Sequence, residues 1–358
     1  MKIGTITFHR ANNYGGVLQC YALVTFLKKK GYDAEVVDYR CKAIEDSYRL
    51  LRLTSIKGFL LSFLTIKKRY CALKNFSSFR KNYLPISKTI YNGVNDFDNQ
   101  YGICIIGSDQ VWSTKIVKGF DSIYFGDFSN KIRKIGYAVS SAVDSKWYKS
   151  DEEPQMAKYI DNFSYFSTRE KSFADNLSKY TTTKIETVID PSLLLTKEDY
   201  EEIIIEPKEQ NYVLYYNQEY NSLTKDIVQS VARQVGASNI VVITGVKEDF
   251  GIPSRYYDLS TLSVPYFLGL IKNATAVVTT SFHGTAYSLV FRKDFYFVAN
   301  YASDRASNLL SQVGASDRLI KVGSTIIFSK VNYETIGKQL NEYRSKSEQF
   351  LISAIEQK

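Results

Sequence analysis

The amino-acid sequence predicts a two-domain α/β protein in which each domain is built on a Rossmann-like parallel sheet. The chain has 358 residues, which exceeds the size that a single hydrophobic core usually reaches. Hydrophobic residues make up 44% of the chain, so each half can bury a core of its own. A strand–helix–strand pattern also occurs in each half. We therefore predict an N-terminal domain over residues 1–185 and a C-terminal domain over residues 186–358.

The first of these patterns lies at the N-terminus. Residues 2–8 alternate as a strand does and lead into an Asn/Gly-rich turn at residues 12–16. Over residues 17–30 the apolar side chains recur at helical spacing, and Gly31 is placed to end that helix. Residues 34–39 form the next apolar run. A strand, a helix and a second strand in this order predict a βαβ unit with parallel strands.

The remaining elements continue this alternation. Residues 44–82 are predicted to form a helical, basic insertion in the first domain. The other expected strands are residues 103–106, 135–140, 165–168, 186–189, 212–216, 239–244, 276–280 and 295–298. The other expected helices are residues 152–162, 171–178, 222–235, 265–273 and 331–357. In open parallel sheets ligands bind at the carboxyl ends of strands, so the loops that follow strands should hold the chemistry.

The charge of the chain favours anionic partners. Its 46 basic and 37 acidic residues give a net charge of +9, which suits phosphates, acidic sugars, a membrane surface or nucleic acid. A basic surface without any partner explains the same excess equally well. The sequence has no RNP-like or helix-turn-helix pattern, so we expect no nucleic acid as a partner.

The cysteines predict neither a disulfide framework nor a metal site. None of the four belongs to a CxxC pair, and no histidine lies near them at the spacing of metal ligands. Cys104 lies in an apolar run and Cys20 in a helical pattern, which is typical of small buried residues. We therefore expect a reducing compartment.

One short apolar segment bears on membrane contact. The N-terminus lacks the apolar core of a signal peptide, and no apolar run approaches the roughly 20 residues that span a bilayer. Residues 56–66 come closest, and basic residues flank them on both sides. They could lie in a membrane interface, although a plain core helix is the simpler interpretation. We expect a cytoplasmic protein that is at most peripheral at the inner face of the membrane.

The strongest candidate for chemistry surrounds His283. Residues 279–285 join a buried strand to a helix and include Ser281, His283 and Gly284. Backbone N–H groups at such a helix N-terminus, together with the Ser281 hydroxyl, bind phosphate or carboxylate, and Gly284 allows close backbone approach. An imidazole titrates near neutral pH and can move protons. The alternative is a helix cap with a histidine packed on the helix.

Polar residues also follow two strands of the N-terminal domain. Asn13, Tyr14 and Gly15 lie in the turn that opens the first helix, where two glycines can cradle an anion or a sugar hydroxyl. This turn matches neither a dinucleotide-binding pattern nor a P-loop, and a plain turn is the alternative. Asp109 and Gln110 follow the strand at residues 103–106.

The loop that contains Asp109 has the sequence GSDQVW. Asp109 could deprotonate a hydroxyl, and Gln110 could hydrogen-bond a sugar. Trp112 could stack on an apolar sugar face. The alternative is a helix cap formed by Ser108 and Asp109.

Arg169 lies in the sequence STRE after another short strand. Its planar fork suits a carboxylate or a phosphate. The alternative is a surface pair with Glu170, which would contribute little. The sequence that begins at Asp190, DPS, is typical of a structural turn.

These motifs, in this order and spacing, resemble the polysaccharide pyruvyl transferase family. They are NNYGGVLQ near the start, GSDQVW, STRE, DPSLLL, and SFHG before a helix. The resemblance extends from about Ile3 to Arg318. It implies a glycosyltransferase B-like fold with two Rossmann-like domains facing a cleft. It also implies transfer of pyruvate from phosphoenolpyruvate, as a ketal, to sugars of cell-wall polymers, capsules or lipid-linked repeat units, with no further cofactor and no metal.

The resemblance also suggests roles for individual residues. Arg169 and His283 match the Arg and His of the family's donor site, where His283 would supply a proton or hold phosphate. We add Asp109 as the base near the acceptor. The donor side would comprise Arg169, Ser281, His283, Gly284 and Arg305. The acceptor side would comprise Asn13, Tyr14, Gly15 and Gln110.

One position departs from the family pattern. Some characterised members have an Arg two residues before the histidine, and this chain has Ser281 there. Arg292, Lys293 or Arg305 could replace the missing cation, or the donor differs. Two other functions therefore stay open: a glycosyltransferase B-type enzyme that uses a nucleotide-sugar, and a non-catalytic module that binds an anionic polysaccharide.

Overall fold

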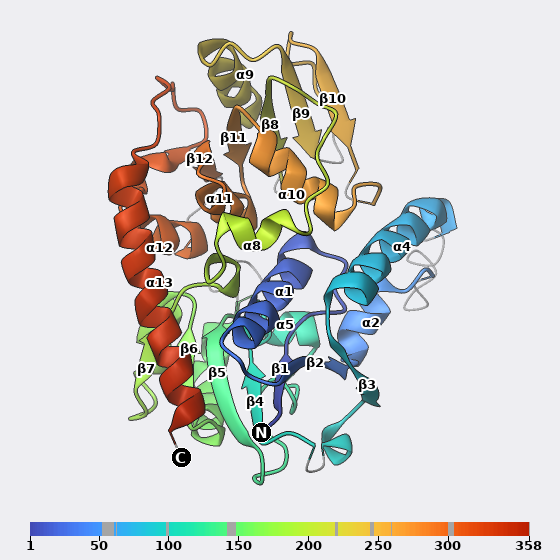
Figure 1. Cartoon of the computed structure of the whole chain (residues 1–358), viewed down its shortest axis with the longest axis vertical. Helices are drawn as coiled ribbons and strands as arrows, with labels where there is room; N and C mark the ends of the chain where they lie inside the picture. Colours follow the sequence, from blue (N-terminus) through green and yellow to red (C-terminus); the bar gives the residue numbers. More distant parts are fainter. Residues whose placement is uncertain are drawn as a thin grey trace. The chain divides into compact units, whose positions relative to one another are not determined.

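The protein is described by a computed structural model, which forms two compact units (Figure 1). The N-terminal unit comprises Met1–Leu194 and Tyr343–Lys358, and the C-terminal unit comprises Leu195–Glu342. The described residues are 1–51, 61, 63–97, 100–141, 148–218, 221–243, 247–258, 260–299 and 304–357.

The N-terminal unit contains a seven-stranded parallel sheet in the order β3-β2-β1-β4-β5-β6-β7. Its strands are β1 (Ile3–Ile6), β2 (Ala34–Tyr39), β3 (Ile86–Tyr91), β4 (Ile103–Ile106), β5 (Arg133–Val139), β6 (Tyr165–Thr168) and β7 (Ile185–Thr187). Strands β2 and β3 lie on one side of β1, and β4 to β7 lie on the other. The winding therefore reverses between β1 and β4, so the loops after these two strands meet at the carboxyl edge of the sheet.

Helices complete the N-terminal unit. They are α1 (Tyr14–Lys29), α2 (Lys42–Tyr48), α4 (Ile66–Tyr83), α5 (Thr114–Val117), α6 (Glu153–Tyr159) and α7 (Lys171–Leu177). The short turn η4 (Pro191–Leu193) packs against α1. Helix α13 (Tyr333–Glu356) begins in the C-terminal unit and ends in the N-terminal unit. Within the described part of the chain, no helix combines the length and the apolar character needed to cross a membrane.

The C-terminal unit repeats this design with six parallel strands in the order β10-β9-β8-β11-β12-β13. They are β8 (Tyr212–Tyr216), β9 (Asn239–Ile243), β10 (Ser254–Tyr257), β11 (Ala276–Thr279), β12 (Asp294–Ala299) and β13 (Leu319–Lys321). Its helices are α8 (Lys197–Glu201), α9 (Thr224–Gln234), α10 (Val264–Asn273), α11 (Phe282–Val290) and α12 (Asp304–Gln312). Here the winding reverses between β8 and β11. The α/β fold predicted for each domain is confirmed, and the cleft between the domains stays a prediction.

The domain boundary differs from the predicted one. Strand β7 pairs with β6, so residues 186–187 belong to the N-terminal sheet, and the division falls after Leu194. Residues 343–358 also group with the N-terminal unit. The sequence pattern located β7 and α13 but could not show which sheet β7 joins or where the last helix packs. Of the predicted basic insertion, residues 52–60 and 62 lie outside the described residues, and α2 and α4 are helical as predicted.

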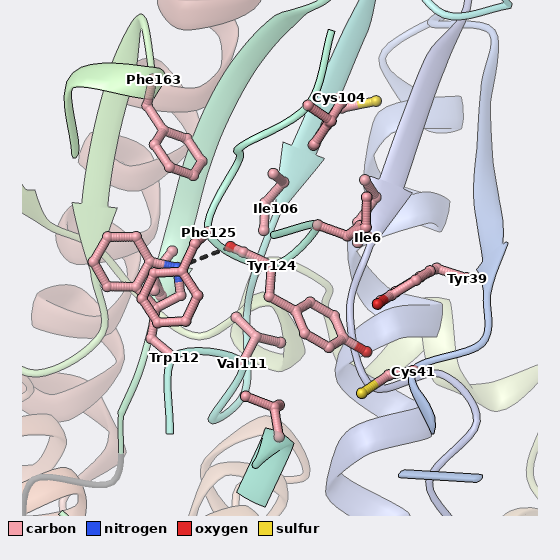
Figure 2. Close-up of a cluster of buried hydrophobic side chains, with 14 of the residues drawn as sticks. Ile6, Tyr39, Cys41, Cys104, Ile106, Val111, Trp112, Tyr124, Phe125 and Phe163 are labelled. Atoms are coloured by element: carbon pink, nitrogen blue, oxygen red, sulfur yellow. Dashed lines mark hydrogen bonds between the residues drawn. The ribbon is translucent and has the colours of Figure 1, made fainter. Parts of the chain in front are cut away.

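Trp112 is part of the hydrophobic core, so the prediction that it stacks on a sugar is wrong. Its side chain is completely buried. Its ring stacks on Phe125 with centroids 4.6 Å apart and lies 4.7 Å from the ring of Phe166. The indole N–H donates to the carbonyl of Tyr124 at 2.9 Å (Figure 2). Trp112 is thus buried among aromatic rings, which are those of Phe125, Phe163, Phe166 and Phe173.

All four cysteines are free thiols, as predicted. Cys20 and Cys104 are fully buried, which confirms their predicted role as small core residues. Burial, assisted by the charge of Asp121, raises the pKa of the Cys41 thiol to about 12. A thiol with such a pKa stays protonated at neutral pH and is unreactive.

We predict that Trp112→Ala destabilises the N-terminal unit by about 3–5 kcal/mol, because it leaves a large cavity among aromatic rings. Urea unfolding followed by far-UV circular dichroism measures this change. The control is Tyr180→Ala, which truncates an exposed aromatic residue of the same unit and should change stability by about 0.5 kcal/mol or less. Equal unfolding midpoints for the two variants would contradict the core assignment.

Candidate functional site

The loop after β1 forms the start of α1. Asn13 caps the helix, and its side-chain oxygen accepts a hydrogen bond from the Gly16 N–H at 3.3 Å. Asn13 is exposed, whereas Tyr14 and Gly15 are buried. The ring of Tyr14 packs against Phe76 of α4 with centroids 5.2 Å apart. Asn13 is therefore accessible to a ligand. Tyr14 packs in the core beside α4, and its contact with the acceptor sugar stays a prediction.

Asp109 lies beside this helix start. Its Oδ2 is 3.2 Å from the position that a Cβ atom on Gly16 would occupy. Its Oδ1 accepts a hydrogen bond from the Gln110 N–H at 2.8 Å. The structure thus brings together Asp109, Gln110 and the Asn13–Gly16 turn, which come from separate loops of the chain. The Asp109 carboxylate therefore lies beside the N-terminal end of α1.

The backbone of Asp109 has a left-handed conformation with φ at 66°. Residues other than glycine seldom adopt it, although aspartate and asparagine tolerate it best. Such backbone strain is more frequent at functional sites than elsewhere. Asp109 is half-buried, so part of its side chain remains accessible to a ligand.

A buried hydrogen-bond network connects the loops at the carboxyl edge of this sheet. Gln19 Nε2 donates to Thr7 Oγ1 at 2.8 Å, and Thr7 Oγ1 donates to the Ser108 carbonyl at 3.0 Å. Ser108 Oγ donates to Asp190 at 3.1 Å, and Arg169 Nη1 donates to the same Asp190 oxygen at 2.9 Å. The network thus runs from α1 through the ends of β1 and β4 to β6 and the segment after β7.

Arg169 lies at the far end of this network. Its Nε donates to Glu170 at 3.0 Å, and its Nη2 donates to Ser140 Oγ at 3.1 Å. Burial alone would lower the pKa of Arg169, but the carboxylates of Glu170 and Asp190 raise it above its ordinary value. The side chain is 4% exposed. Arg169 therefore forms buried ion pairs with Glu170 and Asp190, and the alternative of a surface pair is wrong. That Arg169 contacts the donor substrate stays a prediction.

A second charged cluster surrounds His9 beside the same edge. The buried His9 ring lies 3.2 Å from Asp38 Oδ1, and Arg10 and Arg40 donate to the same carboxylate at 3.2 and 3.1 Å. Burial would raise the pKa of Asp38, but the hydrogen bonds with His9 and Arg40 and the charge of Arg10 hold it well below its usual range. Sequence reasoning missed this cluster, because Asp38 lies within β2 near its end and Arg40 follows the strand without a recognisable motif.

Arg80 of α4 connects this cluster to the turn before α1. Its Nη1 donates to Asn12 Oδ1 at 3.2 Å. Burial and the charge of Arg10 lower the pKa of Arg80 to about 10, so the guanidinium remains charged at neutral pH. The basic insertion therefore supports the turn that holds Asn13.

In the C-terminal unit, the site candidates lie at the start of α11. Ser281 caps the helix and accepts a hydrogen bond from the Gly284 N–H at 3.4 Å. His283 is half-buried in the first turn, and its ring lies edge-on to that of Phe282 with centroids 5.1 Å apart. A Cβ atom on Gly284 would lie 2.3 Å from Thr279 Oγ1. Gly284 therefore allows α11 to approach β11 closely. A glycine is needed here for packing, whether or not a ligand binds.

Asn217, which sequence reasoning missed, lies beside this helix start. It directly follows β8, and its Oδ1 accepts a hydrogen bond from Thr280 Oγ1 at 3.1 Å. Its side chain is 5% exposed, and its Nδ2 has no hydrogen-bond partner among the described residues. A buried amide donor without a partner costs free energy unless a ligand or water satisfies it. The only sequence signal is its position directly after a predicted strand.

The three candidate replacements for the missing cation lie at different places. Arg292 and Lys293 follow the C-terminal end of α11, about 13 Å from its start at a rise of about 1.5 Å per residue. Lys293 Nζ donates to the Lys272 carbonyl at 3.0 Å, at the amino edge of the sheet. These two residues therefore cannot replace an arginine at position 281. Arg305 lies in the first turn of α12, which follows β12 at the same edge as His283.

The described residues offer no obvious metal site. No three of their His, Cys, Asp and Glu side chains gather as metal ligands would.

Comparison with known proteins identifies one family. A model described as polysaccharide pyruvyl transferase matches residues 13–301. No curated protein matches the chain.

Solved structures with low sequence identity share the fold. A protein from Listeria monocytogenes described as a UDP-N-acetylglucosamine 2-epimerase aligns with a TM-score of 0.50 at 11% identity, over 99% of this chain and 90% of its own. The UDP-GlcNAc 2-epimerase from Neisseria meningitidis bound to UDP-GlcNAc aligns at 0.46, with 9% identity over 98% and 94%. The glycosyltransferase SnogD from Streptomyces nogalater aligns at 0.42, with 11% identity over 98% and 96%. The first of these supports the two-domain α/β fold.

We predict a graded loss of stability along the buried network. Arg169→Leu leaves two buried carboxylates without their cation and should cost about 3–5 kcal/mol, whereas Ser108→Ala removes one hydrogen bond and should cost about 1 kcal/mol. The control is Arg255→Ala, because Arg255 is 60% exposed and its ion pair with Glu209 should contribute about 1 kcal/mol or less. Urea unfolding at pH 7 measures all three. Arg169→Leu as stable as wild type would exclude a structural ion pair.

We also predict a pH-dependent effect of Asp38. Its folded-state pKa lies below the unfolded value of about 3.9, so its contribution is fully present above that pH and declines as the pH falls. Asp38→Asn should therefore lower the melting temperature clearly at pH 7 and by a smaller amount at pH 3. Asp127→Asn, which changes an exposed aspartate of the same unit, should have little effect at either pH. An Asp38→Asn deficit that is the same at pH 7 and pH 3 would refute the ion pairing.

Proposed function

Because the chain belongs to the polysaccharide pyruvyl transferase family, we propose that it transfers the pyruvyl group of phosphoenolpyruvate to a sugar as a ketal and releases phosphate. The acceptor is a sugar of a surface polysaccharide or of a lipid-linked repeat unit. The observation that carries the proposal is the family match over residues 13–301, which includes Asn13, Asp109, Arg169 and His283.

The start of α11 supports an anionic donor. Backbone N–H groups at the N-terminus of a helix, aided by its dipole, favour phosphate and carboxylate. The unsatisfied Nδ2 of Asn217 adds a donor at this place, and Arg305 adds a cation at the same edge of the sheet. In this proposal Asn217 and Arg305 offset the absence of an arginine at Ser281.

The proposed chemistry consists of an addition and then a displacement at one carbon. His283 donates a proton to the terminal carbon of phosphoenolpyruvate, and a sugar hydroxyl adds to the neighbouring carbon while Asp109 accepts its proton. A second hydroxyl then attacks that carbon, and the carbon–oxygen bond to phosphate breaks. The proton of the second hydroxyl leaves with phosphate, so the product is a cyclic ketal and inorganic phosphate. General acid–base catalysis of this kind needs one group that gives a proton and one that accepts it.

Ser281 is the observation that favours a second candidate. Without an arginine at this position, the donor site could instead serve the diphosphate of a nucleotide-sugar in a glycosyltransferase B-type enzyme. A non-catalytic polysaccharide-binding module is the third candidate, and it requires ligand binding without turnover.

A thermal-shift experiment tests the donor without knowledge of the acceptor. We predict that phosphoenolpyruvate raises the melting temperature of wild type by a few degrees, since a ligand at about a hundred times its Kd stabilises by roughly 2.7 kcal/mol. His283→Ala and Asn217→Ala should lose this shift. Lys225→Ala, which changes the first turn of α9 in the same unit, should keep it.

The other ligands of the panel separate the candidates. If UDP, GDP or CMP raises the melting temperature and phosphoenolpyruvate does not, the glycosyltransferase that uses a nucleotide-sugar replaces the proposal. Retention of the phosphoenolpyruvate shift by a folded His283→Ala variant would remove His283 from the donor site.

A further inference from the structure

One surface of the N-terminal unit exposes apolar side chains next to basic ones. Phe63 is 62% exposed and Leu64 is 80% exposed. Isolated exposed apolar residues are ordinary, but a cluster of them marks an interaction site. We call this cluster the α4 surface, and it consists of Leu61, Phe63, Leu64, Ile66 and Tyr70 with the neighbouring exposed Lys67, Lys74 and Lys81.

The positive charge of the whole chain is concentrated in the segment that contains this surface. Residues 49–83 include nine Lys and Arg residues and no Asp or Glu. The rest of the chain then has 37 basic and 37 acidic residues, which balance. The net charge of +9 is therefore a property of one segment rather than of the general surface.

Helix α4 separates its buried and exposed faces clearly. Phe76 and Phe79 are buried, and their rings pack against Tyr14 and Tyr21 of α1 at 5.2 and 6.1 Å. At 3.6 residues per turn, the opposite face of the helix presents an apolar and a basic set together. This face consists of Ile66, Lys67, Tyr70, Lys74 and Lys81. All five side chains are exposed, as this geometry requires.

We propose that the α4 surface docks on an anionic lipid bilayer. Apolar side chains that enter the interface, together with lysines that attract anionic headgroups, are the two features of peripheral membrane helices. A second copy of this chain is a poorer occupant, because a symmetric dimer would place two copies of the same unbalanced positive segment against each other.

The docking surface is connected to the predicted acceptor side through α4. The first turns of this helix expose Ile66 and Tyr70, whereas near its end Arg80 donates to Asn12 next to Asn13. In Figure 1, α4 lies beside α1, whose N-terminus carries the acceptor turn. Docking of the first turns therefore keeps that turn within about 21 Å of the docked residues, because 14 residues separate Ile66 from Arg80 at a rise of about 1.5 Å per residue. This last step rests on the proposed function, and it selects a lipid-linked sugar as the acceptor.

Vesicle flotation with the full chain tests the docking. The vesicles contain phosphatidylcholine alone or phosphatidylcholine with 30% phosphatidylglycerol, at low and high salt. We predict that wild type floats only with the anionic vesicles and that high salt weakens binding, because salt screens charges at a membrane surface. Protein that stays at the bottom with anionic vesicles at low salt would overturn the proposal.

Two variants assign binding to the α4 surface. Lys67→Gln/Lys74→Gln should lower the vesicle partition coefficient about thirtyfold, which corresponds to about 1 kcal/mol for each basic residue. Phe63→Ser/Leu64→Ser should lower it at least tenfold through lost apolar burial. The matched controls are Lys338→Gln/Lys346→Gln, which change exposed lysines of α13, and Ile327→Ser, which changes an exposed apolar residue of the C-terminal unit. Both controls should bind like wild type.

Two further readouts separate this proposal from its competitors. If the chain is a dimer that Phe63→Ser/Leu64→Ser dissociates, a second copy covers the surface and the membrane proposal fails. Phosphoenolpyruvate thermal shifts are measured on the same variants without vesicles, and we expect them to be unchanged. A phosphoenolpyruvate shift without vesicle binding would overturn docking alone, whereas vesicle binding without that shift would leave docking supported and overturn the proposed donor.

Discussion

The buried ion pair of Arg169 with Glu170 and Asp190 is the interaction on which the carboxyl edge of the N-terminal sheet depends. A buried guanidinium is tolerated only when carboxylates and hydrogen bonds replace its water. Here Glu170 follows β6 and Asp190 lies in the segment after β7. Ser108 also donates to Asp190, which connects the ion pair to the loop after β4. Asp109 directly follows Ser108, so the loop that holds Asp109 is fixed through the ion pair of Arg169 with Asp190.

This arrangement explains how far the sequence could predict the site. Polar residues directly after apolar strands were recognised, and the structure brings Asp109, Gln110 and the Asn13 turn together as the parallel sheet requires. The pattern could not show which polar residues face a ligand and which face each other. Trp112 follows a strand and could stack on a sugar by its position, but its side chain belongs to the core. The sequence shows the spacing of side chains, whereas their burial depends on contacts between distant strands.

The C-terminal unit shows the same limit in another form. His283 was found because it lies in a strand-to-helix motif, whereas Asn217 has no motif and becomes visible only when β8 and β11 are known to be neighbours. Arg292 and Lys293 were close to His283 in sequence, but α11 carries them to the opposite edge of the sheet. Short strands such as β3, β10 and β13 also escaped prediction, because their alternating or exposed residues lack a continuous apolar run.

Charge and packing assign two tasks to α4. Its buried residues hold the turn that starts α1, and its exposed residues carry much of the positive charge that the remaining chain lacks. Electrostatic attraction at physiological salt reaches only about 8 Å, so charge concentrated in one segment orients the molecule, whereas the same charge spread evenly would not. An enzyme that modifies a sugar fixed to a membrane gains from such an orientation, because docking keeps the enzyme at the plane in which that sugar moves.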